Sequence, residues 1–158
     1  MRQLLVLVII LLTGSGVAAE HNSAQCAPQN GFFIAIGYAR LQSPHEAYIF
    51  GATNLPSGSV LAVACRDFMG KGSHTVSKDA AVTVAPNGLF QVSVVPEQSY
   101  EFKNNMICDV TFHAWQQQAV VLKITGRNGE RLGDGTTNSQ VLTYSGGQYL
   151  EAVTVLHG

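Results

Sequence analysis

Charged side chains are scarce in this sequence, and they form no run of one sign. Nine Lys and Arg residues stand against ten Asp and Glu residues in 158, a formal net charge of −1 at pH 7. Nucleic acids and anionic membrane surfaces are bound through clustered basic side chains. Because the basic residues here are scattered singly, the sequence argues against a nucleic-acid partner and against a polybasic membrane-binding segment.

The common signatures of metal and catalytic sites are also missing. The histidines are widely separated, and neither the H-x-x-x-H nor the C-x-x-C spacing of zinc sites occurs. The G-x-S-x-G sequence, which forms the nucleophile elbow of α/β-hydrolases, is absent as well. We therefore expect no catalytic residue, no metal site and no cofactor, and we interpret the protein as a non-enzyme.

Two short patterns resemble binding motifs but lack essential parts. Cys108 and His113, with His74 upstream, are residue types of a blue-copper site, but no Met follows His113 to serve as the axial ligand. The odd spacing of Cys108 and His113 also places them on opposite faces of a strand. Residues 70–73 (GKGS) contain the Gly-Lys pair of a phosphate loop, without its earlier glycine or a following helix.

A single long apolar run lies at the N-terminus. Residues 4–12 are all Leu, Val or Ile, Arg2 precedes them, and Val17-Ala18-Ala19 places small residues before Glu20 as a signal peptidase requires. The run has about half of the roughly 20 residues that span a bilayer. We predict a cleaved signal peptide over residues 1–19, a secreted or periplasmic mature chain and no membrane span after cleavage. An uncleaved anchor and a lipoprotein attached at Cys26 are the alternatives.

Beyond the signal peptide, apolar residues alternate with polar ones in short runs. Strands are predicted over residues 48–53, 60–66, 74–78, 80–84, 89–95, 107–114, 119–125, 141–144 and 148–156, with a strand or short helix over 32–40. The Asn87-Gly88 pair favours a hairpin between its flanking strands. Seven to nine short strands predict an all-β, immunoglobulin-like antiparallel sandwich. We assign residues 46–158 to the sandwich and residues 20–45 to an N-terminal lead-in.

Three cysteines remain to be placed: Cys26, Cys65 and Cys108. An exported chain reaches an oxidising compartment in which thiols tend to pair. Cys65 and Cys108 both fall on the apolar side of an alternating run, so we predict that they form a disulfide bridging the two layers of the sandwich. Pairings that use Cys26 are the alternatives, and one thiol is left over or joins two chains.

Three pieces of the chain carry a resemblance to a known family. They are residues 51–58 (GATNLPSG), residues 81–84 with 87–90 (AVTV and NGLF), and residues 118–133. Together they resemble a family of small exported bacterial proteins of unknown function that share a G-x-T-N-L-P-x-G turn motif. The resemblance implies an immunoglobulin-like β-fold and export, and it assigns no functional residue. Ala119 stands where the resemblance predicts Pro, and the cysteines are additions to the pattern.

Large apolar side chains beside predicted loops are the remaining functional candidates. They are Phe68, Met69, Tyr100, Phe102 and Trp115. Loops at the ends of a sandwich often carry binding sites, and exposed aromatics serve as anchors. We therefore predict a non-catalytic binding or cell-envelope accessory module whose partner, a protein or an envelope component, is unknown. Two alternatives stay open: that these side chains only cover the core, and that the protein is a periplasmic metal-handling protein or a small enzyme.

Overall fold

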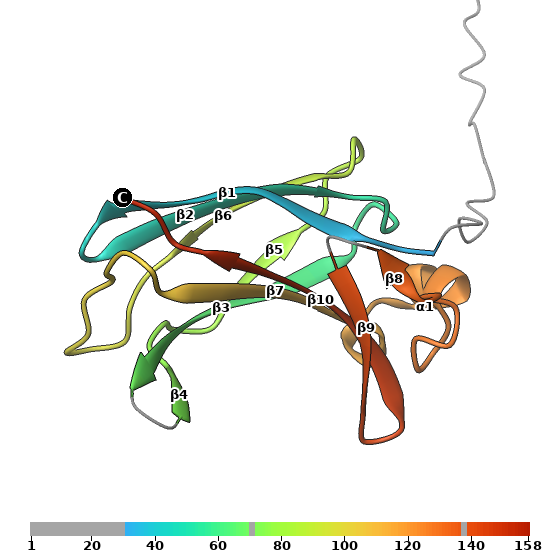
Figure 1. Ribbon diagram of the computed structural model, residues 1–158. Helices are drawn as coiled ribbons and strands as arrows, with labels where there is room; N and C mark the ends of the chain where they lie inside the picture. The colour runs from blue at the N-terminus through green and yellow to red at the C-terminus, as the bar shows by residue number, and fades with distance from the viewer. Residues whose placement is uncertain (1–30, 70–71, 137–138) are drawn as a thin grey trace, which may run out of the picture.

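The computed structural model describes residues 31–69, 72–136 and 139–158. Two antiparallel sheets pack face to face, so the predicted all-β sandwich is confirmed (Figure 1). The smaller sheet has the order β1-β2-β6, and the larger has the order β4-β3-β7-β10-β9-β8, with β5 paired to β3. The strands are β1 Ile34–Ser43, β2 Glu46–Thr53, β3 Val60–Met69, β4 Gly72–Thr75, β5 Ala80–Thr83, β6 Leu89–Val94, β7 Ile107–His113, β8 Gly135–Thr136, β9 Ser139–Tyr144 and β10 Gly147–Val155.

The core lies between the sheets and follows the two-residue rhythm of the sequence. In β6 the side chains of Phe90, Val92 and Val94 are buried, while Gln91 and Ser93 are exposed. Successive side chains of a strand point to opposite faces of the sheet, so this alternation assigns one face to the core and one to solvent. The strand and its alternation of apolar and polar residues, predicted for residues 89–95, are confirmed.

Backbone hydrogen bonds join the two sheets along both sides of the sandwich. On one side, Leu41 N–H donates to the His157 carbonyl at 2.6 Å, beyond the end of β10. On the other side, Lys78 N–H donates to the Val95 carbonyl at 3.0 Å. Unpaired strand edges invite association with other chains. These links satisfy part of the edge backbone within the molecule.

The sandwich begins before residue 46, which corrects the predicted lead-in of residues 20–45. β1 pairs with β2 from Ile34 opposite Thr53 to Ser43 opposite Glu46. A register shift between Ile36 and Tyr38 changes the phase of alternation within β1, as bulges do. The apolar pattern of residues 32–40 therefore does not have a strict period of two, and this is why the sequence left strand and helix open.

Residues 119–125 form a helix, α1 Ala119–Thr125, where the sequence predicted a strand. Val121 and Thr125, one helical turn apart, are its buried residues, whereas Val120 is 59% exposed. The helix ends at Gly126, whose N–H donates to the Leu122 carbonyl at 2.9 Å. β-Branched residues disfavour helices only weakly, so tertiary packing overrides their preference in this short segment.

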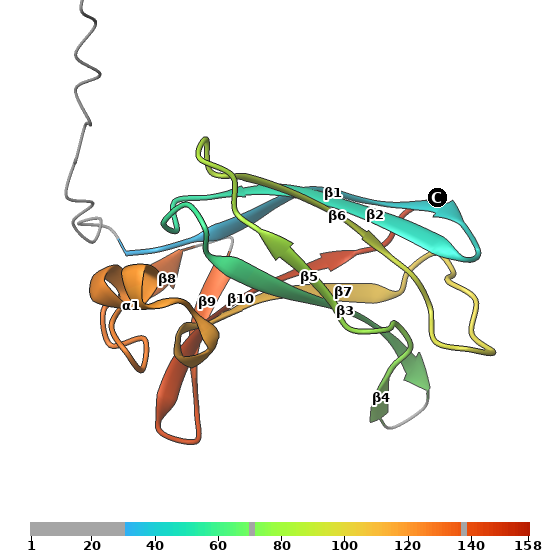
Figure 2. The ribbon, with the colours of Figure 1, turned by 180° about the vertical axis from the view of Figure 1, so that it is seen from behind.

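The Asn87-Gly88 turn carries the chain from one sheet to the other and does not close a two-stranded hairpin. β5 pairs with β3 in the large sheet, whereas β6 pairs with β2 in the small sheet (Figure 2). The local geometry is nonetheless that of a tight turn, with Gly88 N–H donating to the Ala85 carbonyl at 2.9 Å and Gly88 at a φ of +76°. Turn chemistry fixes the reversal of the chain, and long-range packing selects the strand partners.

Two predicted loops contain strands. β3 continues to Met69 and β4 begins at Gly72, both inside the segment 67–73 that separates the predicted strands 60–66 and 74–78. β8 lies within the polar stretch 126–138 and pairs with β9. Glycine and polar residues dominate both stretches, so their apolar pattern gives no strand signal.

The GATNLPSG segment, residues 51–58, forms the end of β2 and most of the turn that leads to β3. Thr53 Oγ1 accepts from Leu55 N–H at 3.1 Å and donates to the Phe33 carbonyl. Asn54 Oδ1 accepts from Phe33 N–H at 2.8 Å, and its Nδ2 donates to the Gly31 carbonyl at 3.0 Å. The polar side chains of the segment are thus used to fix the entry into β1.

Candidate functional site

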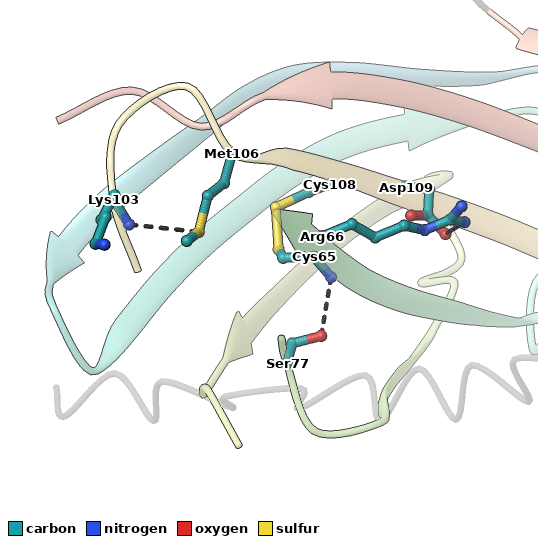
Figure 3. The surroundings of a disulfide bond; sticks show 7 residues. All are labelled: Cys65, Arg66, Ser77, Lys103, Met106, Cys108 and Asp109. Atoms are coloured by element: carbon teal, nitrogen blue, oxygen red, sulfur yellow. Dashed lines mark hydrogen bonds and ion pairs between the residues drawn. A yellow bond between two sulfur atoms is a disulfide. The ribbon is translucent and has the colours of Figure 1, made fainter. Parts of the chain in front are cut away.

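Cys65 and Cys108 form the predicted disulfide, with both residues fully buried (Figure 3). The two residues lie directly opposite each other on β3 and β7, which are neighbours in the large sheet. The bond therefore crosses from strand to strand and does not bridge the two layers as predicted. Ser77 Oγ accepts from Cys65 N–H at 2.8 Å. This hydrogen bond ties the segment between β4 and β5 to β3 beside the disulfide. Cys26 lies outside the described residues.

Of the five predicted anchor residues, the three whose side chains are described, Tyr100, Phe102 and Trp115, do not share one site. Phe102 is 2% exposed and belongs to the core, which contradicts its prediction as an exposed anchor. Tyr100 is half-buried and contacts the His74 ring, with centroids 5.5 Å apart. Phe68 and Met69 lie at the end of β3. Trp115 is 40% exposed and adjoins a different surface, described next.

The outer face of the large sheet, which points away from the core, carries a group of polar and aromatic side chains that was not predicted as a functional site. Asp109, Thr111 and His113 alternate along β7 with Cys108, Val110 and Phe112, which belong to the core. Asp109 and Thr111 are themselves only 5% and 8% exposed. The β3–β4 and β9–β10 hairpins project from the large sheet on this same side (Figures 1 and 2). The face is therefore flanked at two ends.

An ion cluster spans the three central strands of this face. Arg66 Nη2 on β3 lies 2.8 Å from Asp109 Oδ2 on β7 and 4.0 Å from Glu151 Oε1 on β10. The hydrogen bond to Asp109 raises the pKa of Arg66, against the opposing effect of burial. Asp109 Oδ1 is buried and has no hydrogen-bond partner among the described residues. Buried polar atoms without partners are rare in native proteins and call for an explanation.

An aromatic group lies beside the ion cluster. The His113 ring contacts Trp115 and Tyr149, with centroids at 4.9 Å and 5.2 Å. A Cβ atom at Gly147 would approach the Trp115 ring to 2.7 Å, so glycine allows the indole to lie close to β10. His113 Nδ1 is buried without a partner among the described residues. The result is a wall of rings at the end of β7.

A pocket of about 380 Å³ opens on the outer face between these groups. Alanines supply much of its lining, and the polar residues lie around them. The lining residues are Ala62, Val63, Ala64, Asp79, Ala80, Ala81, Asp109, Thr111, His113 and Gln116. The alanines at alternate positions of the predicted strand 60–66 are the sequence signal for this pocket, and by themselves they identify no site.

Gln117 fixes the segment that carries Trp115. Its Oε1 accepts from Val60 N–H at 2.7 Å, and its Nε2 donates to the carbonyls of Val60 at 2.8 Å and His113 at 3.1 Å. Three hydrogen bonds from one nearly buried side chain tie the 3₁₀ turn Ala114–Gln116 to β3. The sequence suggested only a polar turn at this position.

Lowering the pH is expected to destabilise the protein through His113. Burial lowers the pKa of His113 below its ordinary value of 6.5, and Glu151 opposes this effect weakly. The unfolded chain then binds the proton more readily, so this contribution is fully present above about pH 7 and is lost as the pH falls through 6.5 toward the lowered pKa. Urea midpoints measured from pH 7.5 to pH 5 should decline less in His113→Gln than in the original protein. An equal decline in both would contradict the assignment.

The described residues 31–69, 72–136 and 139–158 contain no group of three His, Cys, Asp or Glu side chains arranged to hold a metal ion. Within the same part of the chain, no helix has the length and apolar character needed to cross a bilayer. The resemblance to the G-x-T-N-L-P-x-G family stays a prediction. Comparison of the chain with protein-family models, with curated proteins and with solved structures gave no match.

Proposed function

We propose that this chain is an exported, non-catalytic binding module that holds a partner protein of the cell envelope on the outer face of its large sheet. The N-terminal sequence has the three regions of a signal peptide. The disulfide is of the kind that persists in oxidising compartments. Both features support export, and neither identifies the partner.

The observation that carries the binding role is the pocket whose rim holds two buried, unpartnered polar atoms. Asp109 Oδ1 and His113 Nδ1 both belong to residues that line it. Leaving such an atom without a hydrogen bond costs about 1–3 kcal/mol, which a bound partner can recover. The exposed Trp115 indole nearby is a residue type enriched at interaction hot spots.

The chemistry of the pocket favours binding over catalysis. Its described lining includes no Ser or Cys, and the single hydroxyl among those residues, Thr111 Oγ1, donates to the Ala62 carbonyl at 3.4 Å. The His113 ring contacts the rings of Trp115 and Tyr149, and its Nδ1 has no hydrogen-bond partner among the described residues. A hydrolytic mechanism needs a nucleophile within hydrogen-bond reach of its base.

Site-specific photocrosslinking tests this proposal. A benzophenone amino acid is placed at Thr83 or Tyr144, both exposed beside the outer face, and as a matched control at Leu89 or Gln91 on the exposed face of β6. Irradiation of cells is expected to give a discrete adduct from the first two positions only. Adducts of equal yield from both sheets, or from neither, would overturn the proposal.

A further inference from the structure

We propose that the outer-face pocket receives the cationic side chain of an arginine or lysine from the partner protein. This inference rests on the proposed binding function and names the group that the pocket recognises. Three independent features of the pocket carry it: an excess of carboxylates, an incompletely paired buried aspartate, and a floor of alanines.

Carboxylates outnumber cations at the pocket. Asp79 and Asp109 line it, Glu151 lies beside it, and Arg66 is the one cation in the ion cluster. Asp79 is exposed and forms no ion pair with another described residue. A concave site with one sign of charge concentrates ligands of the opposite sign.

One carboxylate oxygen of Asp109 lacks a hydrogen-bond donor although the side chain is almost completely buried. Its side chain is 7% exposed, and Arg66 pairs with Oδ2, which leaves Oδ1 without a partner among the described residues. A carboxylate accepts hydrogen bonds at both oxygens. A second guanidinium or an ammonium group at this wall would supply the missing donor and would add charge of the sign that the cluster lacks.

The floor of the pocket suits the aliphatic stem of a basic side chain. Ala62 and Ala64 lie directly opposite Thr111 and Asp109, and Ala81 lies opposite Ala62 on the other side of β3. Alanine is depleted in strands, and larger β-branched residues are preferred on a sheet surface. Lys and Arg lay their methylene stems along apolar surface while the charged head finds polar partners. The His113 ring lines the pocket and contacts the Trp115 ring. These aromatic rings can interact favourably with a bound cation.

Nuclear magnetic resonance titration of the purified mature protein tests the inference with two isosteric probes. N-acetyl-arginine amide carries the guanidinium, and N-acetyl-citrulline amide has a neutral urea in its place. Saturable shifts are expected from the arginine probe alone, centred on the backbone amides of Ala62, Ala64 and Asp109. No saturable shift, or equal shifts from the neutral probe, would overturn the inference.

Two variants locate the effect without disturbing the core. Asp79→Asn removes an exposed charge, and Ala81→Leu fills the exposed part of the floor. Asp79→Asn should raise the dissociation constant of the arginine probe by about two- to fivefold, the range for one exposed charge pair. Ala81→Leu should raise it as well, because the larger side chain occupies space that the aliphatic stem needs. Asp134→Asn, an exposed carboxylate elsewhere, should leave it unchanged. Shifts that persist unaltered in both pocket variants would overturn the inference.

Titration with putrescine, a small amine, tests whether the pocket binds a free small molecule in preference to a protein side chain. Putrescine should bind more weakly than the arginine probe, and tighter binding would assign the pocket to a small molecule and overturn the protein partner. The proposed binding face and the proposed recognition of a cationic side chain can be contradicted independently of each other. A photocrosslinked adduct at Tyr144 that forms equally in Asp79→Asn and Ala81→Leu would leave the binding face intact and exclude cation recognition.

Discussion

Replacing Cys65 and Cys108 together by alanine is expected to lower the free energy of unfolding by about 4 kcal/mol. The bond joins residues separated by 43 positions, so its loss releases a long closed loop in the unfolded chain. A loss of this size in a domain of this length lowers the melting temperature by roughly 10–20 °C. Urea unfolding followed by circular dichroism measures the change. Cys108→Ala alone should be nearly as destabilising, because either substitution breaks the bond.

Reduction provides the control for this prediction. Dithiothreitol should bring the unmodified protein close to the double variant and should leave the double variant unaffected. Cys26→Ser should unfold like the unmodified protein. An unchanged melting temperature in Cys108→Ala would show that the disulfide does not contribute to stability.

A chain that starts at Glu46 is expected not to fold. It lacks β1 and the residues just before it, and so loses the buried side chains of Phe32 and Ile34, each of which contributes about 1.5–3 kcal/mol by burial. It also loses the ladder with β2 and the closure with His157. Together these losses approach the total stability of 5–15 kcal/mol of an ordinary domain. Circular dichroism and thermal melting would record a chain without a cooperative transition.

A chain that starts at Gly31 is the matched control, because it keeps every strand of the smaller sheet. It is expected to unfold cooperatively. If the chain from Glu46 melted within a few degrees of this control, β1 would be dispensable and the lead-in boundary predicted from the sequence would be restored.

The central strand β7 serves two purposes at once. Its inward residues Cys108, Val110 and Phe112 form part of the core, and its outward residues Asp109 and His113 belong to the outer-face pocket. Neighbouring strands pair with β7 on both sides, so its backbone is held along its length. Binding groups on such a strand are positioned more rigidly than groups on loops. This places the proposed site on the sheet itself, whereas the sequence directed attention to the loops.

Several features of the fold were accessible from the sequence because they depend on near neighbours. Whether a side chain points in or out of a strand is set by alternation over a few residues, which is why the core of β6 and the apolar side of Cys65 and Cys108 were predicted correctly. The phase change at Ile36 and Tyr38 broke that rule within β1. The helix at 119–125 broke it because its neighbours, and not its β-branched composition, decide its conformation.

What the sequence determined by itself is therefore the character of the chain: a sheet sandwich with a buried cystine, few charges and a leader-like N-terminus. What only the tertiary structure decided is which strands lie side by side. Arg66, Asp109 and Glu151 are far apart along the chain and meet because β3, β7 and β10 are neighbours in one register. Strand pairing depends on packing across the whole molecule, whereas alternation depends on a few neighbouring residues. The sequence alone therefore could not predict which residues meet to form the pocket.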